Sequence, residues 1–213
     1  MTLYKAVRPD GTDFHTGTVR WAPPEGHDGE WIVRHPTSTE IGDKASEHLS
    51  VSTEPTDCIG MTWPCRLLTV EAVGDVTIPS PLDLPNKRAG VSFRVTGELP
   101  AHEVFGPQGE HVVALVDRAH HLTADEQDSL DAAWDAAGDA AGVAAWYDAR
   151  YAAWDAEKDV AWHAAGDVAW HAAGDAAGDA AGALVVRDLI TTDHYDTLTR
   201  AWASVIGKVH PDD

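Results

Sequence analysis

Apolar and polar residues alternate along several short segments within the first 122 residues. In residues 91–95, Val91, Phe93 and Val95 alternate with Ser92 and Arg94, a pattern typical of a strand with one buried face. Shorter apolar runs bounded by Gly, Pro and Asp predict further strands at residues 3–8, 16–21, 31–34, 48–53 and 65–73. Residues 1–122 therefore predict a small β-rich domain.

Eight large apolar residues are the expected core of this domain: Phe14, Trp21, Trp31, Trp63, Leu68, Val70, Phe93 and Val95. Residues 110–119 carry Val112, Val113, Leu115 and Val116, which suit either a last strand or a short helix. We favour the helix.

A different period begins at residue 131. The next 56 residues can be read as tetrads with alanines at the second and third positions, and alanine supplies 23 of these residues. Alanine is the best helix former, and proline is absent from the segment. Thr123 and Glu126 form a capping-box pattern just upstream. The pattern predicts one helix over residues 123–190, roughly 100 Å long at 1.5 Å per residue.

Tryptophan recurs in these tetrads at Trp134, Trp146, Trp154, Trp162 and Trp170. Because four residues advance an α-helix by about 400°, each tetrad position moves about 40° around the axis. The indoles would therefore follow a spiral, which a conventional coiled coil cannot use as a seam. We expect these five tryptophans to bind a protein partner.

Three arrangements of the tetrads are open. The helix is exposed and touches several partners, it bundles with copies of itself, or shorter helices fold back at the glycines, each of which weakens a helix interior by about 1 kcal/mol. Expansion of a repeat in GC-rich DNA explains the number of tetrads equally well.

A last amphipathic helix is predicted within residues 191–213. Thr192 or Asp193 would cap it and Gly207 would end it. Its apolar face comprises Tyr195, Leu198, Trp202, Val205 and Ile206. The predicted fold class is thus α+β: a β-rich domain over 1–122, a long Ala-rich repeat helix over 123–190, and a C-terminal helix and tail over 191–213.

Charge narrows the classes of partner. The net charge is −20, with an excess of 10 negative charges in residues 1–130, 8 in 131–186 and 2 in 187–213. Phosphate neutralisation needs clustered Lys and Arg, so we expect no nucleic-acid partner. No apolar run approaches 18 residues, so we expect no membrane span. With only Cys58 and Cys65 and no signal peptide, we expect a cytoplasmic location, or a virion if a phage encodes the chain. The composition is typical of a high-GC bacterium or its phage.

Several segments resemble one family. They are Tyr4–Ala6, Phe14–His15, the stretch from His48 to Asp57, residues 66–76, and Asn86–Arg88 leading to Phe93–Val95. Over roughly residues 3–105 and in its repeats, the chain is similar to uncharacterised bacterial and phage proteins that join a small N-terminal domain to degenerate Ala-rich repeats. The resemblance implies no activity. Some members carry a Cys-flanked His motif where this chain has residues 47–51, so a site built on that motif is not expected here.

Few residues are candidates for metal binding or catalysis. His163 and His171 lie eight residues apart, about 12 Å along a helix, which is too far for one metal ion. A metal shared between parallel helices is conceivable, but weak surface pairs with Asp159, Asp167 and Asp175 are the commoner outcome. Cys58 and Cys65 have the spacing of neither a redox nor a zinc motif and are expected to be buried thiols. We therefore expect no catalytic residue, metal or cofactor.

One enzymatic alternative is open. Residues Tyr4–Ala6, residues 50–53 and Glu71 resemble the order of an aromatic or basic residue, a Ser-Thr-Ser strand and a late glutamate in ADP-ribosyltransferase-like folds, which implies NAD chemistry. A Glu-x-Glu or Gln-x-Glu motif on a late strand is missing. The preferred hypothesis is a non-enzymatic structural or interaction protein that uses the long helix for self-association or to bind a protein partner.

Overall fold

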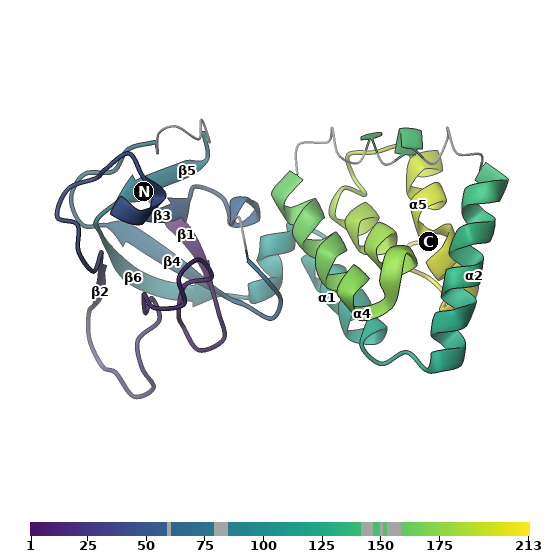
Figure 1. Cartoon of the computed structure of the whole chain (residues 1–213), viewed down its shortest axis with the longest axis horizontal. Helices are drawn as coiled ribbons and strands as arrows, with labels where there is room; N and C mark the ends of the chain where they lie inside the picture. The colour runs from purple at the N-terminus through teal and green to yellow at the C-terminus, as the bar shows by residue number, and fades with distance from the viewer. Residues whose placement is uncertain (59–60, 79–84, 142–146, 150, 153–158) are drawn as a thin grey trace. The chain divides into compact units, whose positions relative to one another are not determined.

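The chain divides into two compact units. The computed structural model describes residues 1–58, 61–78, 85–141, 147–149, 151–152 and 159–213. Unit 1 is Met1–Val104 and unit 2 is Phe105–Asp213. The sequence placed the end of the N-terminal domain at residue 122, but the helix before that point packs with the other helices and belongs to unit 2 (Figure 1).

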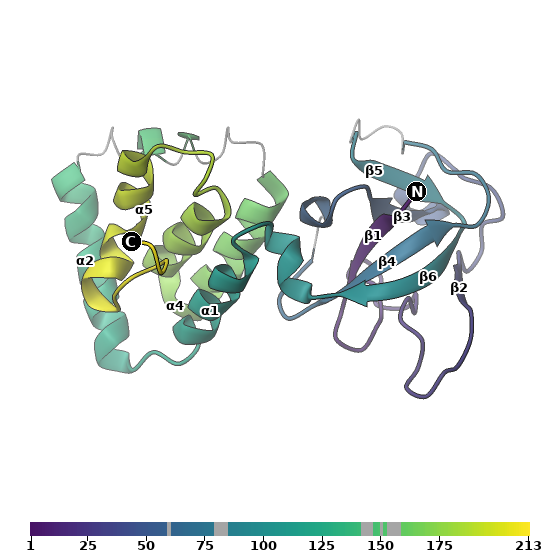
Figure 2. The same cartoon turned by 180° about the vertical axis from the view of Figure 1, so that it is seen from behind.

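Unit 1 is built on one antiparallel sheet (Figure 2). Its described strands run in the order β2-β6-β4-β1-β3-β5. Their bounds are β1 Leu3–Val7, β2 Trp31–Arg34, β3 Leu49–Ser52, β4 Arg66–Ala72, β5 Lys87–Gly90 and β6 Ser92–Leu99. Short 3-10 helices span Ala45–Glu47, Pro55–Asp57 and Ala101–Phe105.

Alternation located most of these strands. The predicted segments at 3–8, 31–34, 48–53, 65–73 and 91–95 correspond to β1, β2, β3, β4 and β6, and these predictions are confirmed. Trp21, Leu68, Val70 and Phe93 lie in the core, with Trp31 and Val95 packed against it. Phe14 and Trp63 are only partly buried.

The strand predicted at 16–21 is wrong. The Asp13 carboxylate accepts hydrogen bonds from the Thr16 and Val19 amides, at 2.5 and 2.9 Å. An Asp side chain that captures nearby amides in this way offers the backbone a turn instead of a ladder. Only an isolated bridge, Thr12 with Arg20, remains in this segment.

Unit 2 is helical. Its named helices are α1 Gly109–Ala119, α2 Ala124–Ala141, α4 Asp159–Val185 and α5 Thr192–Val205. α4 packs against α1, α2 and α5, and α2 also packs against α5. The helix favoured at 110–119 is α1, and Thr123 forms the predicted capping box with Glu126.

The predicted long repeat helix over residues 123–190, and with it the predicted fold, is wrong. α4 is broken at Ala173 and Gly174, where Gly174 has φ 76° and ψ −164°, a region essentially restricted to glycine. Across the break, a Cβ at Gly166 would lie 3.5 Å from the Gly178 carbonyl oxygen. Twelve residues of straight helix would separate these positions by about 18 Å. The two arms of α4 therefore fold back on each other.

Small side chains explain why the arms pack and do not extend. Eight of the alanines described in α4 are buried, which lets its arms pack closely against their neighbours alongside larger buried side chains such as Leu130 and Trp202. The alanines are Ala165, Ala169, Ala173, Ala176, Ala177, Ala180, Ala181 and Ala183. The tetrads of α4 therefore contribute to a core. Of the three arrangements left open by the sequence, α4 shows the one in which shorter helices fold back at a glycine.

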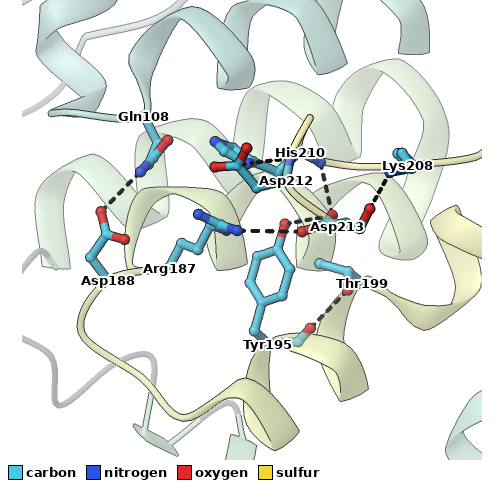
Figure 3. A network of polar contacts seen from close by, with 9 residues as sticks. All are labelled: Gln108, Arg187, Asp188, Tyr195, Thr199, Lys208, His210, Asp212 and Asp213. Carbon is cyan, nitrogen blue, oxygen red and sulfur yellow. Dashed lines mark hydrogen bonds and ion pairs between the residues drawn. The ribbon is translucent and has the colours of Figure 1, made fainter.

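The C-terminal helix forms where it was predicted, and the chain after it packs against the rest of unit 2. Its cap is Thr191, not the predicted Thr192 or Asp193, and the Thr191 hydroxyl accepts from the His194 amide at 3.2 Å. Beyond α5, the Asp213 side chain accepts from the Tyr195 hydroxyl at 3.2 Å and pairs with Arg187 at 3.6 Å (Figure 3). Nearby, Gln108 Nε2 donates to Asp188 at 2.9 Å.

Among the described residues, no helix combines the length and the apolar composition that crossing a membrane requires.

Candidate functional site

A cavity of about 460 Å³ lies within unit 1. Parts of β1, β3 and β5 line it together with the loops that follow β1 and β2 and with Cys58. Its polar lining includes two lysines, three histidines and one carboxylate: Lys5, Lys87, His15, His35, His48 and Asp13. The volume falls in the range of small-molecule sites in proteins.

Lys5 occupies the middle of β1, between core residues. Leu3 and Val7 are buried in the core, and the strand period places Lys5 on their face. The Lys5 amine donates to the Ser50 carbonyl at 2.9 Å and lies 5.0 Å from the centre of the Trp21 ring. Burial lowers the pKa of this amine, while the charges of Cys58 and Asp13 act in the opposite direction.

Lys87 opens β5 and is only 8% exposed. It pairs in register with Ser52 of β3, and its amine donates to the Ser52 hydroxyl oxygen at 2.8 Å. The Ser52 hydroxyl in turn donates to the Asp57 carbonyl at 2.9 Å. Burial lowers the pKa of Lys87 to about 8; Cys58 and Asp57 oppose this shift, and Lys5 adds to it.

The Asp13 charge interacts with that of Lys5, but its carboxylate is held mainly by hydrogen bonds from its own loop. Its oxygens are occupied by the Thr16 amide at 2.5 Å, the Thr16 hydroxyl at 2.7 Å and the Val19 amide at 2.9 Å. Burial raises the pKa of Asp13, but these hydrogen bonds and the Lys5 charge outweigh burial, so its pKa lies below the ordinary value. The carboxylate is ionised and holds the loop that forms one wall.

Within the described parts of the chain, neither Lys5 nor Lys87 forms an ion pair with a carboxylate. Trp21, which also lines the cavity and is 1% exposed, has a buried indole N–H without an acceptor among the described residues. The cavity therefore offers hydrogen-bond donors and positive charge to whatever enters it.

The three histidines of the cavity differ in exposure and in hydrogen bonding. His48 is buried and its Nδ1 lies 3.1 Å from the Gly42 carbonyl. His35 Nδ1 accepts from the Ser38 amide at 2.8 Å, so that nitrogen carries no proton. His15 is exposed. In the described ranges, no three His, Cys, Asp or Glu side chains are grouped so as to hold a metal ion.

Both cysteines are buried and unbonded, which confirms the prediction from their spacing. Cys58 lines the cavity, whereas Cys65 Sγ contacts Met61 Sδ at 3.9 Å. Burial, reinforced by Cys58, raises the pKa of Cys65 to about 12. Cys65 is therefore an unreactive apolar side chain at neutral pH.

The tryptophans predicted to bind a partner lie in unit 2. Trp134 is partly buried and its Nε1 donates to Asp179 at 3.0 Å, whereas Trp170 is 50% exposed. Trp146 and Trp154 lie outside the described residues, as does the side chain of Trp162. The exposed His171 Nδ1 lies 2.6 Å from the Asp167 carbonyl of its own helix.

The residues of the enzymatic alternative do not share this cavity. Ser52 lines it, but Tyr4 and Glu71 are not part of its wall. The Glu71 carboxylate lies 3.7 Å from the Arg94 guanidinium. This cavity therefore does not bring Tyr4, Ser52 and Glu71 together.

Lys5 and Lys87 were not predicted to share a site, although Lys5 lies in the segment Tyr4–Ala6 of the enzymatic alternative and Lys87 in the segment Asn86–Arg88 of the family resemblance. The sequence held one signal for Lys5: it lies two residues from both Leu3 and Val7, so the strand period places it on the same buried face. No local pattern marks Lys87, because residues 87–90 read Lys-Arg-Ala-Gly and show no apolar alternation.

The chain matches no protein-family model, no curated protein and no solved structure.

Proposed function

We propose that unit 1 binds a small organic anion in its cavity and that this binding is its function. The main observation is that the amines of the partly buried Lys5 and the buried Lys87 line one cavity, and that neither forms an ion pair with a carboxylate among the described residues. A buried charge without a partner is costly, and a fully buried lysine tends to lose its proton. An anion that enters the cavity would stabilise both ammonium groups and so gain affinity.

The remaining lining fits such a ligand. Trp21 provides an apolar ring and a spare N–H donor, and the Asp13 carboxylate is already occupied by its own loop. Charge-assisted hydrogen bonds from lysine suit a carboxylate or a phosphate. We propose a binding protein and no reaction of the ADP-ribosyltransferase type, since Tyr4 and Glu71 are absent from the cavity wall.

Location and partners follow the same proposal. Unbonded Cys58 and Cys65 support a cytoplasmic protein, because thiols stay reduced there. A net charge of −20 supports a ligand small enough to enter the cavity over a nucleic acid, whose phosphates the chain as a whole would repel.

Thermal unfolding with added lactate or inorganic phosphate tests the proposal. A ligand that binds only the folded state stabilises it by about 2.7 kcal/mol at one hundred times its Kd. We expect at least one of these anions to raise the unfolding temperature, and ethylammonium, a cation of similar size, to leave it unchanged.

Two variants sharpen this test. Lys5→Met and Lys87→Met should each abolish the anion response, whereas Lys44→Met should retain it because the Lys44 side chain is 79% exposed and lies outside the cavity. An equal loss in Lys44→Met, or no response to either anion in the unmodified chain, would refute the proposal.

Self-association of unit 2 is a second candidate, favoured by the half-exposed Trp170 on α4. Exposed aromatic area on an Ala-rich helix is a common feature of interfaces. Sedimentation velocity should show dimers of the intact chain that Trp170→Ala dissociates and that Leu189→Ala, which also removes an exposed apolar side chain, preserves. A strictly monomeric chain would exclude this second function.

A further inference from the structure

We infer that the anion bound in unit 1 is a 2-oxo acid, and that the Lys87 amine forms a reversible imine with its carbonyl carbon while Lys5 holds its carboxylate. This inference rests on the proposed function, because it requires the same cavity to accept an anion. It adds the chemical class of the ligand and assigns a separate role to each lysine.

The spacing of the two amines supports this ligand class. Lys5 is anchored on Ser50 and Lys87 on Ser52, two residues apart along β3. Two residues of a strand span about 6.6 Å, and the two amines influence each other's charge across the cavity. In a 2-oxo acid the carbonyl carbon is bonded directly to the carboxylate. One 2-oxo acid molecule can therefore place its carbonyl carbon at the Lys87 amine and its carboxylate at the Lys5 ammonium.

The hydrogen bonds distinguish the nucleophile from the charge holder. Ser52 directs its own proton to the Asp57 carbonyl, so its oxygen can only accept from Lys87. A neutral amine satisfies that acceptor with one N–H and keeps its lone pair for attack. Because the pKa of Lys87 is about 8, a substantial fraction of this amine is neutral near that pH.

Lys5 is better placed to carry charge. Its amine faces the Ser50 carbonyl oxygen and the Trp21 ring, and both interact more strongly with an ammonium than with an amine. A bound carboxylate beside Lys5 would raise its pKa again and fix it in the protonated form.

The step balances without a redox partner. The Lys87 lone pair forms a C–N bond to the carbonyl carbon, and the π electrons move to the carbonyl oxygen, which takes up a proton. The nitrogen loses one proton to give the carbinolamine, whose hydroxyl takes up a second proton and leaves as water while the nitrogen lone pair forms the C=N bond. The nitrogen then loses its remaining proton. One amine and one carbonyl thus give one imine and one water, and hydrolysis reverses the reaction.

Reductive trapping tests this assignment. The intact protein is incubated with pyruvate and sodium cyanoborohydride at pH 8, and the modified residue is located by peptide mass spectrometry. We expect a single reduced adduct on Lys87. Lactate, which has the carboxylate but no carbonyl, should bind without an adduct and should compete with pyruvate for trapping.

Lys87→Arg keeps the positive charge without the nucleophile, so it should lose the adduct, while Lys44→Arg should be labelled at Lys87 like the unmodified chain. An adduct on Lys5, or labelling spread over exposed lysines, would overturn the inference. If calorimetry shows that pyruvate and lactate bind but no adduct forms, the imine is refuted and the anion site stands. If neither acid binds but inorganic phosphate does, the 2-oxo acid is refuted and the anion site stands; if none of the three binds, both proposals fail. Because the adduct is mapped in the unmodified protein, the result does not depend on folding of a variant.

Discussion

Lys5 and Lys87 are buried amines of the same cavity with different surroundings. Lys5 lies against a carbonyl oxygen and a tryptophan ring, whereas Lys87 donates to a hydroxyl that is itself committed elsewhere. In both cases burial is the largest cause of the lowered pKa. Without a ligand, each protonated amine therefore costs the fold free energy, and both residues are better explained by binding than by stability.

Stability should therefore increase when a lysine of the cavity is made apolar. In the ligand-free protein, we expect Lys5→Met to raise the free energy of unfolding of unit 1 by about 1 to 3 kcal/mol, because a methionine of similar length removes the desolvated amine. Urea denaturation followed by circular dichroism measures the change. Lys44→Met, at an exposed position, should lie within about 0.5 kcal/mol of the unmodified chain. A loss of stability in Lys5→Met would mean that Lys5 supports the fold.

The lowered pKa of Lys87 should make the stability of the protein depend on pH. Its pKa is about 8 in the folded protein against 10.5 when unfolded, so the unfolded chain binds more protons between these values and stability rises with pH there. The full free-energy cost of burying the protonated Lys87 amine is present below pH 8. Between pH 7 and pH 9, the Lys87 contribution should improve by about 1 kcal/mol.

The difference between variants isolates this effect, because Cys65 acts in the opposite direction: its raised pKa, about 12, lowers stability as pH rises above 9. Lys87→Met should be more stable than the unmodified chain at pH 7, and its advantage should shrink by about 1 kcal/mol at pH 9. An advantage that does not change with pH would show that the Lys87 pKa is not lowered.

At the scale of elements, α4 depends on one glycine. Gly174 has φ 76° and ψ −164°, and the two arms meet where Gly166 and Gly178 approach. Gly174→Ala should lower the free energy of unfolding of unit 2 by about 1 to 3 kcal/mol, because alanine is strained in that region. Urea unfolding followed by helical circular dichroism measures this change.

Gly166→Ala is the matched control. A Cβ there meets only ordinary contact with the Gly178 carbonyl oxygen at 3.5 Å, and the backbone is helical. It should therefore be neutral or stabilising by up to about 1 kcal/mol. Equal effects of the two variants would contradict the assignment of the break to Gly174.

The same glycine shows why the sequence predicted part of the fold and not the rest. Strand alternation reports which face is buried, so β2, β4 and β6 could be located from local pattern alone. The tetrads around Gly166, Gly174 and Gly178 read alike, and helix propensity does not say which glycine leaves the helical region. That choice is made by the packing of one arm on the other. The cavity is likewise non-local, because Lys5, Ser52 and Lys87 come from three different strands.

At the scale of the whole molecule, the two units have different cores. Unit 1 buries Leu, Val, Trp and Phe side chains around a sheet, and unit 2 buries many alanines of its helices together with larger apolar side chains. Because the anion cavity lies entirely in unit 1 and the α4 break entirely in unit 2, ligand and mutation should act on separate unfolding transitions. Calorimetry of the intact chain should show two unfolding transitions, one for each unit. Added anion should raise the midpoint temperature of the unit 1 transition alone, and Gly174→Ala should lower that of the unit 2 transition alone. A single transition that both perturbations move would mean that the units unfold as one, and the binding energy of the anion would then stabilise the helices as well as the sheet.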